Sequence, residues 1–307
     1  MTGGAYVTLK QLTRLRYRAR GFSYLPTQPV RSVLAGRKRS RLRGRGLDFD
    51  ELRHYRPGDD IRNMDWKITQ RIGSPYVRVY TEERDRPVWM VVDQRLSMFF
   101  GSQHQMKSVA AAEAAALTAW RVLAVGDRIG AVIFNDQQQF IAKPSRSERS
   151  TIAWFEKLVE FNNDLTACAD KTSQPKALAS ALQTLAPRLG HDGLVVIVSD
   201  FDGWSEVCLD TLKLINRSND VVAAVVSDPL ERDIVSANNL VVSDGRYQLE
   251  IKTTNSPAQE RFKADYDQRF SNLIDSLKRH AIPVLALSTH TDISRQIQRL
   301  LGGAGNR

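Results

Sequence analysis

The sequence predicts a doubly wound α/β fold, in which a mostly parallel sheet carries helices on both faces. Continuous apolar runs at 88–92 and 194–198 have the length and composition of strands that are buried on both faces of a parallel sheet. Helical stretches separate such runs along the chain, as in repeated strand–helix units. Asp93 and Asp200 lie at the ends of the two runs, so both carboxylates are expected at the carboxyl edge of the sheet.

In chain order, the first strand of this sheet is expected over 88–93. An alanine-rich helix over 107–125 follows it, and Gly126 ends that helix. A second buried strand is expected over 128–134, with a short edge strand at 138–142.

The alternation continues in the middle of the chain. Helices are expected over 147–161 and 175–189, and the third strong strand spans 194–199. A helix over 205–217 and a strand over 221–226 come next. Right-handed crossovers between parallel strands then place helices on both faces of the sheet.

One segment, 228–255, departs from the alternation of strands and helices. Alternating runs at 240–243 and 247–251 flank Asp244 and Gly245, a strong signal for a two-stranded hairpin. We therefore expect an inserted β-hairpin near the end of the preceding strand.

The C-terminal part completes the α/β domain, which is expected to span 87–301. Its last elements are a long helix over 257–280, a strand over 283–287 and a helix over 293–301. Residues 302–307 are expected to form a flexible tail.

The stretch 46–86 is dense in charge of both signs but is threaded with large apolar residues, so it is expected to fold as a small β-rich unit. Pro57 and Gly58 indicate a turn, and 76–80 has the pattern of a strand. Its charges form either an exposed ion-pair cluster or a surface that binds a partner. The candidates for partner binding are Arg53, Tyr55, Arg56, Asp59, Asp60 and Arg62.

Four bulky residues of this stretch are expected to pack the small unit against the main sheet: Tyr55, Pro57, Trp66 and Tyr76. This packing would present the charged residues outward.

Residues 45–66, RGLDFDELRHYRPGDDIRNMDW, resemble the signature of the domain-of-unknown-function 58 family, and the order of elements is similar from about 31 to 301. The resemblance implies a von Willebrand factor A-like domain. Proteins of this family are often encoded beside MoxR-type AAA+ ATPases. The resemblance therefore implies a role beside such an ATPase, in assembling or maturing a client protein.

The same resemblance implies a metal-ion-dependent adhesion site, whose first motif is Asp-x-Ser-x-Ser and whose oxygen ligands suit Mg²⁺. Here the motif contains Asp93, Arg95 and Ser97, so an arginine replaces the first serine, and no clear threonine precedes the helix at 175. An arginine would repel a divalent cation and neutralise the carboxylates. The expected site is therefore degenerate and metal-free. Its residues are Asp93, Arg95, Ser97, Asp200 and Asp202.

Two alternatives to this degenerate site stay open. Mg²⁺ could still bind at Asp93, Ser97 and Asp200. In the simplest case, the two aspartates only pair with Arg95 and cap helices.

The N-terminal residues 1–45 hold twelve Lys or Arg and no acid, and subtracting these twelve from the net charge of +10 leaves −2 for the rest. A short amphipathic helix is expected over 9–20. This basic arm, residues 9–45, has three interpretations. It folds onto the body or a protein partner, it lies on an anionic membrane surface, or it binds nucleic acid.

Composition limits the size of the core and the cellular location expected for the chain. The chain has 307 residues and 42% hydrophobic content, enough for one sizeable core and a smaller unit. No run approaches the roughly 18 consecutive apolar residues of a membrane span, and the beginning of the chain lacks the apolar segment of a secretory signal. Cys168 and Cys208 fit neither a metal motif nor a disulfide framework. The expected location is the cytoplasm, either free or peripheral to the membrane.

No catalytic motif emerges from the sequence. The five histidines have no metal-binding spacing, no serine or cysteine lies in a nucleophile elbow, and no glycine-rich loop would cradle phosphate. We therefore expect a non-enzymatic adaptor that acts with a MoxR-type ATPase. The alternative is a protein that binds nucleic acid or an anionic membrane surface through its basic arm.

Overall fold

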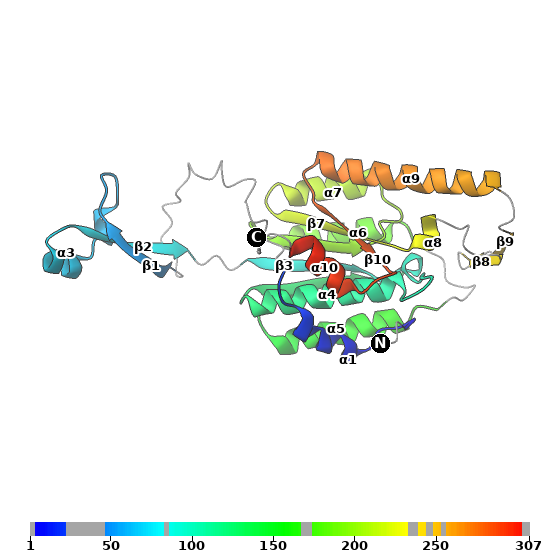
Figure 1. Cartoon of the computed structure of the whole chain (residues 1–307), viewed down its shortest axis with the longest axis horizontal. Coiled ribbons are helices and arrows are strands. Elements are labelled where there is room, and N and C mark those ends of the chain that lie inside the picture. Colours follow the sequence, from blue (N-terminus) through cyan, green and yellow to red (C-terminus); the bar gives the residue numbers. More distant parts are fainter. Residues whose placement is uncertain are drawn as a thin grey trace. The chain divides into compact units, whose positions relative to one another are not determined.

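The computed structural model describes residues 4–22, 47–82, 86–166, 174–232, 239–243, 248–252 and 256–302 (Figure 1). The chain forms two compact units. One comprises residues 1–27 and 86–307, and the other comprises residues 28–85. Residues 4–22, the described part of the expected basic arm, belong to the large unit.

The large unit is built on a six-stranded sheet in the order β10-β7-β6-β3-β4-β5. Five strands run parallel, and β5 pairs antiparallel with β4 at the edge. The mixed α/β class with a mostly parallel sheet is thus confirmed. The strands are β3 (Pro87–Asp93), β4 (Arg128–Phe134), β5 (Gln139–Ser145), β6 (Leu194–Ser199), β7 (Asp220–Ser227) and β10 (Val284–Ser288).

Helices cover both faces of this sheet because alternate residues of its apolar strands point in opposite directions. Met90 and Val92 of β3 belong to one core cluster, whereas Trp89 and Val91 belong to the other. Figure 1 shows α4 and α5 on one side of the sheet and α7 and α9 on the other. The helices are α1 (Leu9–Arg14), α4 (Lys107–Ala124), α5 (Glu148–Asn163), α6 (Ala177–Leu185), α7 (Glu206–Asn216), α8 (Pro229–Arg232), α9 (Ser256–Arg279) and α10 (Ile293–Leu301).

The strand order reverses between β3 and β6. The chain passes from β3 outward to β4 and β5, and then returns to add β6 on the other side of β3. Ligand-binding sites of open α/β sheets form at such a reversal, outside the carboxyl ends of the strands. Asp93 and Asp200 lie at this edge.

The predicted hairpin insertion is present. The strands β8 (Asn239–Ser243) and β9 (Gln248–Lys252) pair antiparallel in a separate two-stranded sheet. The predicted turn residues Asp244 and Gly245 lie outside the described residues.

The small unit pairs β1 (Leu47–His54) with β2 (Tyr76–Glu82) in an antiparallel ladder. Between them lies α3 (Trp66–Ile72), which the sequence analysis did not predict. Asp65 caps this helix by accepting hydrogen bonds from the backbone N–H groups of Lys67 and Ile68 at 3.1 Å. Gly73 ends it in the left-handed conformation (φ 77°) that glycine adopts without strain.

Trp66 is exposed within the small unit, and its expected packing against the main sheet stays a prediction. Trp66 is the first residue of α3, and 65% of its surface is exposed. The neighbouring Asp65 is buried instead, because its carboxylate caps the helix and also receives the Nε of Arg78 at 2.8 Å. Within the small unit, a Trp66 truncation therefore removes little of the buried area whose loss costs about 3–5 kcal/mol for a buried tryptophan.

The N-terminal segment 4–22 packs on the core of the large unit, as in the interpretation that the basic arm folds onto the body. Leu12, Leu15 and Ala19 are buried in the same core cluster as α4. The indole N–H of Trp120 donates to the carbonyl of Leu12 at 2.9 Å. The apolar face of this helix is thus already covered, so it cannot enter a membrane surface while the segment is packed.

Charged contacts add to this packing. Arg16 binds Glu148 of α5 with two hydrogen bonds of 2.7 and 2.8 Å, and Arg18 binds Asp292 before α10 at 2.8 Å. The basic residues between 23 and 46 lie outside the described residues. None of the helices in the described ranges is long and apolar enough to cross a bilayer.

Replacing Leu12 with alanine tests the packing of the N-terminal segment. Because Leu12 is fully buried, Leu12→Ala should lower the free energy of unfolding by roughly 2–5 kcal/mol. Tyr17→Ala is the matched control, since Tyr17 is 79% exposed and its loss should change stability by no more than about 0.5 kcal/mol. Chemical denaturation followed by circular dichroism measures both. Equal stability of the two variants would show that the segment is not part of the core.

Candidate functional site

Two carboxylates lie side by side at the carboxyl edge of the sheet. Asp93 is the last residue of β3, and Asp200 directly follows β6, which pairs with β3 in parallel register. Their side chains are 0% and 8% exposed. Burial removes water from both groups, so their charges require compensation from the protein.

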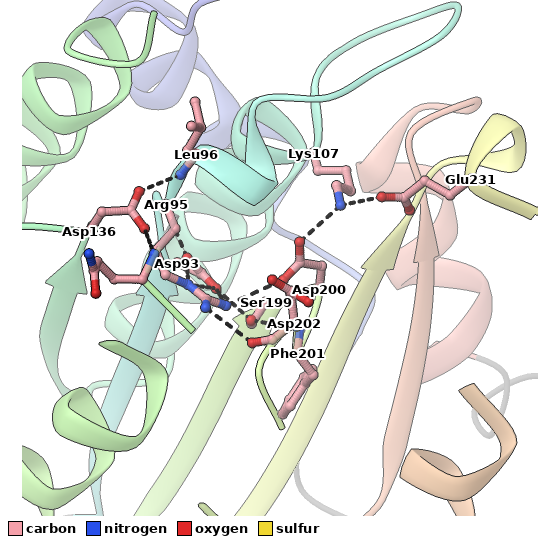
Figure 2. A network of polar contacts seen from close by, with 11 residues as sticks. Asp93, Arg95, Leu96, Lys107, Asp136, Ser199, Asp200, Phe201, Asp202 and Glu231 are labelled. Carbon is pink, nitrogen blue, oxygen red and sulfur yellow. Dashed lines mark hydrogen bonds and ion pairs between the residues drawn. The ribbon is translucent and has the colours of Figure 1, made fainter. Parts of the chain in front are cut away.

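Arg95 supplies the first compensating charge, and Figure 2 shows its guanidinium between the two aspartates. Its Nη2 donates to Oδ2 of Asp93 at 2.7 Å, and its Nε donates to Oδ1 at 3.0 Å. Nη2 also reaches Oδ1 of Asp200 at 3.4 Å, and Nη1 donates to the carbonyl of Asp202 at 3.1 Å. The arginine thus binds both strand ends, although its own side chain is 0% exposed.

Lys107 supplies the second compensating charge. It is the first residue of α4, and its Nζ donates to Oδ2 of Asp200 at 2.9 Å and to Glu231 of α8. The side chain is 3% exposed. Lys107 and Glu231 were not among the predicted site residues. The only sequence signal for Lys107 is that a charged residue opens the alanine-rich helix after β3.

These buried charges shift one another's ionisation. Burial raises the pKa of Asp93, although the charge and hydrogen bonds of Arg95 act in the opposite direction. Burial also favours a higher pKa for Asp200, but Lys107 and Arg95 outweigh it and hold that pKa below its usual value. Burial tends to lower the pKa of Lys107, yet Asp200 and Glu231 raise it above its ordinary value. Both cations therefore keep their protons at neutral pH.

The donor set does not fit a divalent cation. Both oxygens of Asp93 already accept hydrogen bonds from Arg95, and Oδ2 also accepts the hydroxyl of Ser199 at 2.6 Å. A metal ion would have to displace a buried guanidinium from Asp93. Among the described residues, no group of three or more His, Cys, Asp or Glu is placed to hold a metal.

Ser97 and Asp202 take different positions from the two aspartates. The Ser97 hydroxyl is buried and has no hydrogen-bond partner among the described residues. Asp202 contributes its backbone carbonyl to Arg95, while the residue itself is exposed. The structure thus brings Asp93, Arg95 and Asp200 into direct contact and leaves the Ser97 and Asp202 side chains outside those contacts.

The loop after β6 carries backbone strain at this edge. Phe201 adopts a left-handed conformation (φ 57°) that costs a non-glycine residue of order 1 kcal/mol. Gly203 has φ 72°, and a Cβ there would lie 2.4 Å from the carbonyl oxygen of Pro175. This strain fixes the path of the segment that presents the Asp202 carbonyl to Arg95.

Two further aspartates fix the surrounding loops. Asp136 accepts hydrogen bonds from the N–H groups of Leu96 at 2.7 Å and Gln174 at 2.6 Å. Asp228, at the end of β7, accepts from the N–H of Ser102 at 2.9 Å and from the Thr289 hydroxyl. Residues that follow five strands, β3, β4, β6, β7 and β10, therefore make contacts along the same edge of the sheet.

In the small unit, the predicted partner-binding residues divide into two groups. Arg53 and Asp59 bind each other through two hydrogen bonds of 2.7 and 2.9 Å, and Asp59 is largely buried. Asp60 caps a short 3-10 turn by accepting the N–H of Arg62 at 3.0 Å. These carboxylates are structural, so a double asparagine variant would disturb folding as well as any binding.

The other three predicted residues of this unit remain candidates for contact with a partner. Arg56 and Arg62 are exposed, and Tyr55 is half-buried. Ile61 and Trp66 nearby in the chain are also exposed, at 58% and 65%.

A family model and related proteins match most of the chain. The family model described as "Protein of unknown function DUF58" matches residues 51–271, well over half of the chain. Uncharacterized protein Rv1480 of Mycobacterium tuberculosis and Uncharacterized protein Mb1516 of Mycobacterium bovis are each 28% identical over 284 residues, which cover 89% of this chain and 84% of theirs.

Solved structures resemble the chain only weakly. The conserved hypothetical protein BatB from Bacteroides thetaiotaomicron gives a TM-score of 0.37 at 11% identity, over 70% of this chain and 98% of that one. Proximal thread matrix protein 1 from the mussel byssus gives a TM-score of 0.30 at 12% identity, over 47% and 38% of the two chains. Neither likeness carries an argument about this chain.

Removing the Arg95 charge should destabilise the large unit strongly. Arg95→Gln leaves Asp93 buried without its cation, and breaking a buried pair in this way costs about 3–5 kcal/mol. Lys213→Gln is the control, because the Lys213–Asp210 pair is exposed and should contribute less than about 1 kcal/mol. Urea denaturation compares the two losses. Similar small losses for both variants would mean that Arg95 does not compensate the site.

Proposed function

Because the chain belongs to the DUF58 family, we propose that it is a non-enzymatic adaptor that works with a MoxR-type AAA+ ATPase to assemble or mature a client protein. In this proposal the large unit is a von Willebrand factor A-like domain, and its adhesion site is degenerate. The family resemblance supports the ATPase partnership, and the chemistry of the strand ends supports the binding role.

The observation that carries the proposal is the pairing of Asp93 with Arg95. A catalytic acid, base or metal ligand must exchange a proton or a ligand during a reaction cycle. Both oxygens of Asp93 are instead occupied by a permanently charged guanidinium, and Asp200 is held by Arg95 and Lys107. Such a fixed arrangement favours a rigid scaffold that presents surfaces to partners.

The motif around Asp93 supports the interpretation that the adhesion site is degenerate. The expected Asp-x-Ser-x-Ser pattern has Arg95 at its first serine position, and this arginine binds both aspartates. We propose that the positive charge of the guanidinium compensates the two carboxylates, as a metal ion would otherwise do at this edge. The site then needs no cation from solution in order to fold or to bind.

The small unit is the proposed contact surface for the ATPase. Arg56 and Arg62 are exposed in the part of the chain that carries the family signature, beside the exposed apolar Ile61 and Trp66. Exposed cations around apolar groups match the composition of many protein interfaces, where arginine and tryptophan are enriched.

A thermal-shift experiment tests the independence from metal. Millimolar Mg²⁺ or Mn²⁺ should leave the melting temperature of the wild-type protein unchanged relative to EDTA, since a ligand that binds only the native state must raise it. Arg95→Ser should introduce at least a weak metal-dependent rise, because it frees the oxygens of Asp93 and restores the serine. A clear stabilisation of the wild type by Mg²⁺ would contradict the proposal and return Asp93, Ser97 and Asp200 as ligands.

Co-purification from the native cell tests the partnership. The tagged wild-type chain should retain an AAA+ ATPase, and Arg56→Gln with Arg62→Gln should retain roughly tenfold less, since both cations are exposed at the proposed contact. The melting temperature of this variant should not change. Lys157→Gln with Lys213→Gln removes two exposed cations of the large unit and serves as the control.

Three results would contradict the adaptor proposal. The ATPase could be missing from the wild-type fraction, or both double variants could retain it equally. Recovery of nucleic acid in its place, with binding that falls steeply as salt rises, would favour the alternative that the basic segment binds phosphates.

A further inference from the structure

A cavity of about 1000 Å³ opens beside the charged network, on the face of the sheet that carries α7 and α9. Lys107, Asp200 and Glu231 line it, so the network is its polar floor. Ser97 also lines it, and the buried hydroxyl of this residue has no hydrogen-bond partner among the described residues. The cavity therefore reaches the ends of β3 and β6, where Figure 2 shows the network.

The polar floor carries more negative than positive charge. Two carboxylates that line it, those of Asp200 and Glu231, share the cation of Lys107, while Arg95 pairs with the fully buried Asp93 and also reaches Asp200. One negative charge is left over in a region where burial makes an uncompensated charge costly. Burial raises the pKa of Glu231, although the charge and the hydrogen bond of Lys107 act in the opposite direction.

The rim of the cavity adds further negative charge. Asp202, on the loop after β6, and Glu206, the first residue of α7, line it and are exposed. Two arginines of α9 line it as well. Arg269 is paired with Asp265 of its own helix, whereas Arg279 donates its Nε to a backbone carbonyl, a contact that does not neutralise its charge. Four carboxylates and three cations therefore line the cavity, so its lining carries one more negative than positive formal charge in a chain whose net charge is +10.

Aromatic side chains form two of the cavity walls. Phe201 and Trp204 lie edge to face with ring centroids 5.9 Å apart, on the loop after β6. Tyr266 and Phe270 stack with centroids 6.2 Å apart, on α9. Aromatic faces attract cations, most strongly where water is excluded, and guanidinium groups also stack on them.

We propose that this cavity binds a segment of a protein partner that inserts an arginine or lysine side chain between the aromatic walls, toward Asp200 and Glu231. The inserted cation supplies the positive charge that the floor lacks, and Asp202 and Glu206 attract it at the rim. The volume suits several residues of a peptide rather than a single small ion. This inference rests on the proposed adaptor role, since it identifies the chemistry by which the large unit recognises its partner.

Matched peptides test the proposal by isothermal titration calorimetry on the full chain. One peptide is N-acetyl-Leu-Ala-Arg-Ala-Leu-amide, and the other replaces the arginine with citrulline, which keeps the shape but removes the charge. At low salt the arginine peptide should bind at least about tenfold more tightly, and the ratio should shrink as salt screens the rim charges.

Charge-removing variants locate the binding. Asp202→Asn with Glu206→Gln should weaken the arginine peptide by roughly three- to tenfold, because both carboxylates are exposed and their attraction is partly screened. Asp210→Asn with Glu156→Gln removes two exposed carboxylates that do not line the cavity, and it should leave the affinity unchanged. Equal melting temperatures of the variants would show that all are folded.

Several outcomes would overturn the proposal. These are binding of neither peptide, equal binding of the two, or equal weakening by the rim variant and its control. Such a result would not affect co-purification of the ATPase through Arg56 and Arg62, so a failure of the cavity assignment can be told apart from a failure of the adaptor role.

Discussion

The arrangement at the carboxyl edge of the sheet depends on one interaction, the contact of the Arg95 guanidinium with Asp93 and Asp200. The strand reversal between β3 and β6 brings two carboxylates to the same buried place. Their mutual repulsion and their loss of water must be offset by a nearby positive charge. Arg95 lies two residues after Asp93, and its planar fork of donors can contact both acids and a backbone carbonyl at once.

The surrounding elements hold this arginine in place. The strained backbone at Phe201 turns the Asp202 carbonyl toward it, and Asp136 fixes the loop on its other side through the N–H of Leu96. Lys107 extends the charge compensation to Glu231 and so links α4 to the segment after β7. The same links define the floor of the cavity, so the groups that stabilise the edge also shape what it can bind.

Much of the carboxyl edge of the sheet could be predicted from the sequence, because the residues that indicate it are close together in the chain. Apolar runs locate the ends of β3 and β6, and Arg95 is close enough to Asp93 in the chain for a contact to be expected. Lys107 and Glu231 could not be paired in this way, because 124 residues separate them and only the packing of α4 against the strand ends brings them together. The seven residues of α3 are too few for a helical period to stand out. The apolar stripe of the N-terminal helix could be recognised in the sequence. Its packing partner could not, because a stripe alone does not identify the surface that covers it.

A double-mutant cycle on Asp93 and Arg95 tests the central claim most directly. The free energy of unfolding would be measured for the wild type, Asp93→Asn, Arg95→Gln and the double variant. If the guanidinium is the charge that makes the buried carboxylate tolerable, the two residues should show a coupling free energy of about 2–3 kcal/mol. A coupling within about 0.5 kcal/mol of zero would mean that the two side chains act independently, and would contradict the account.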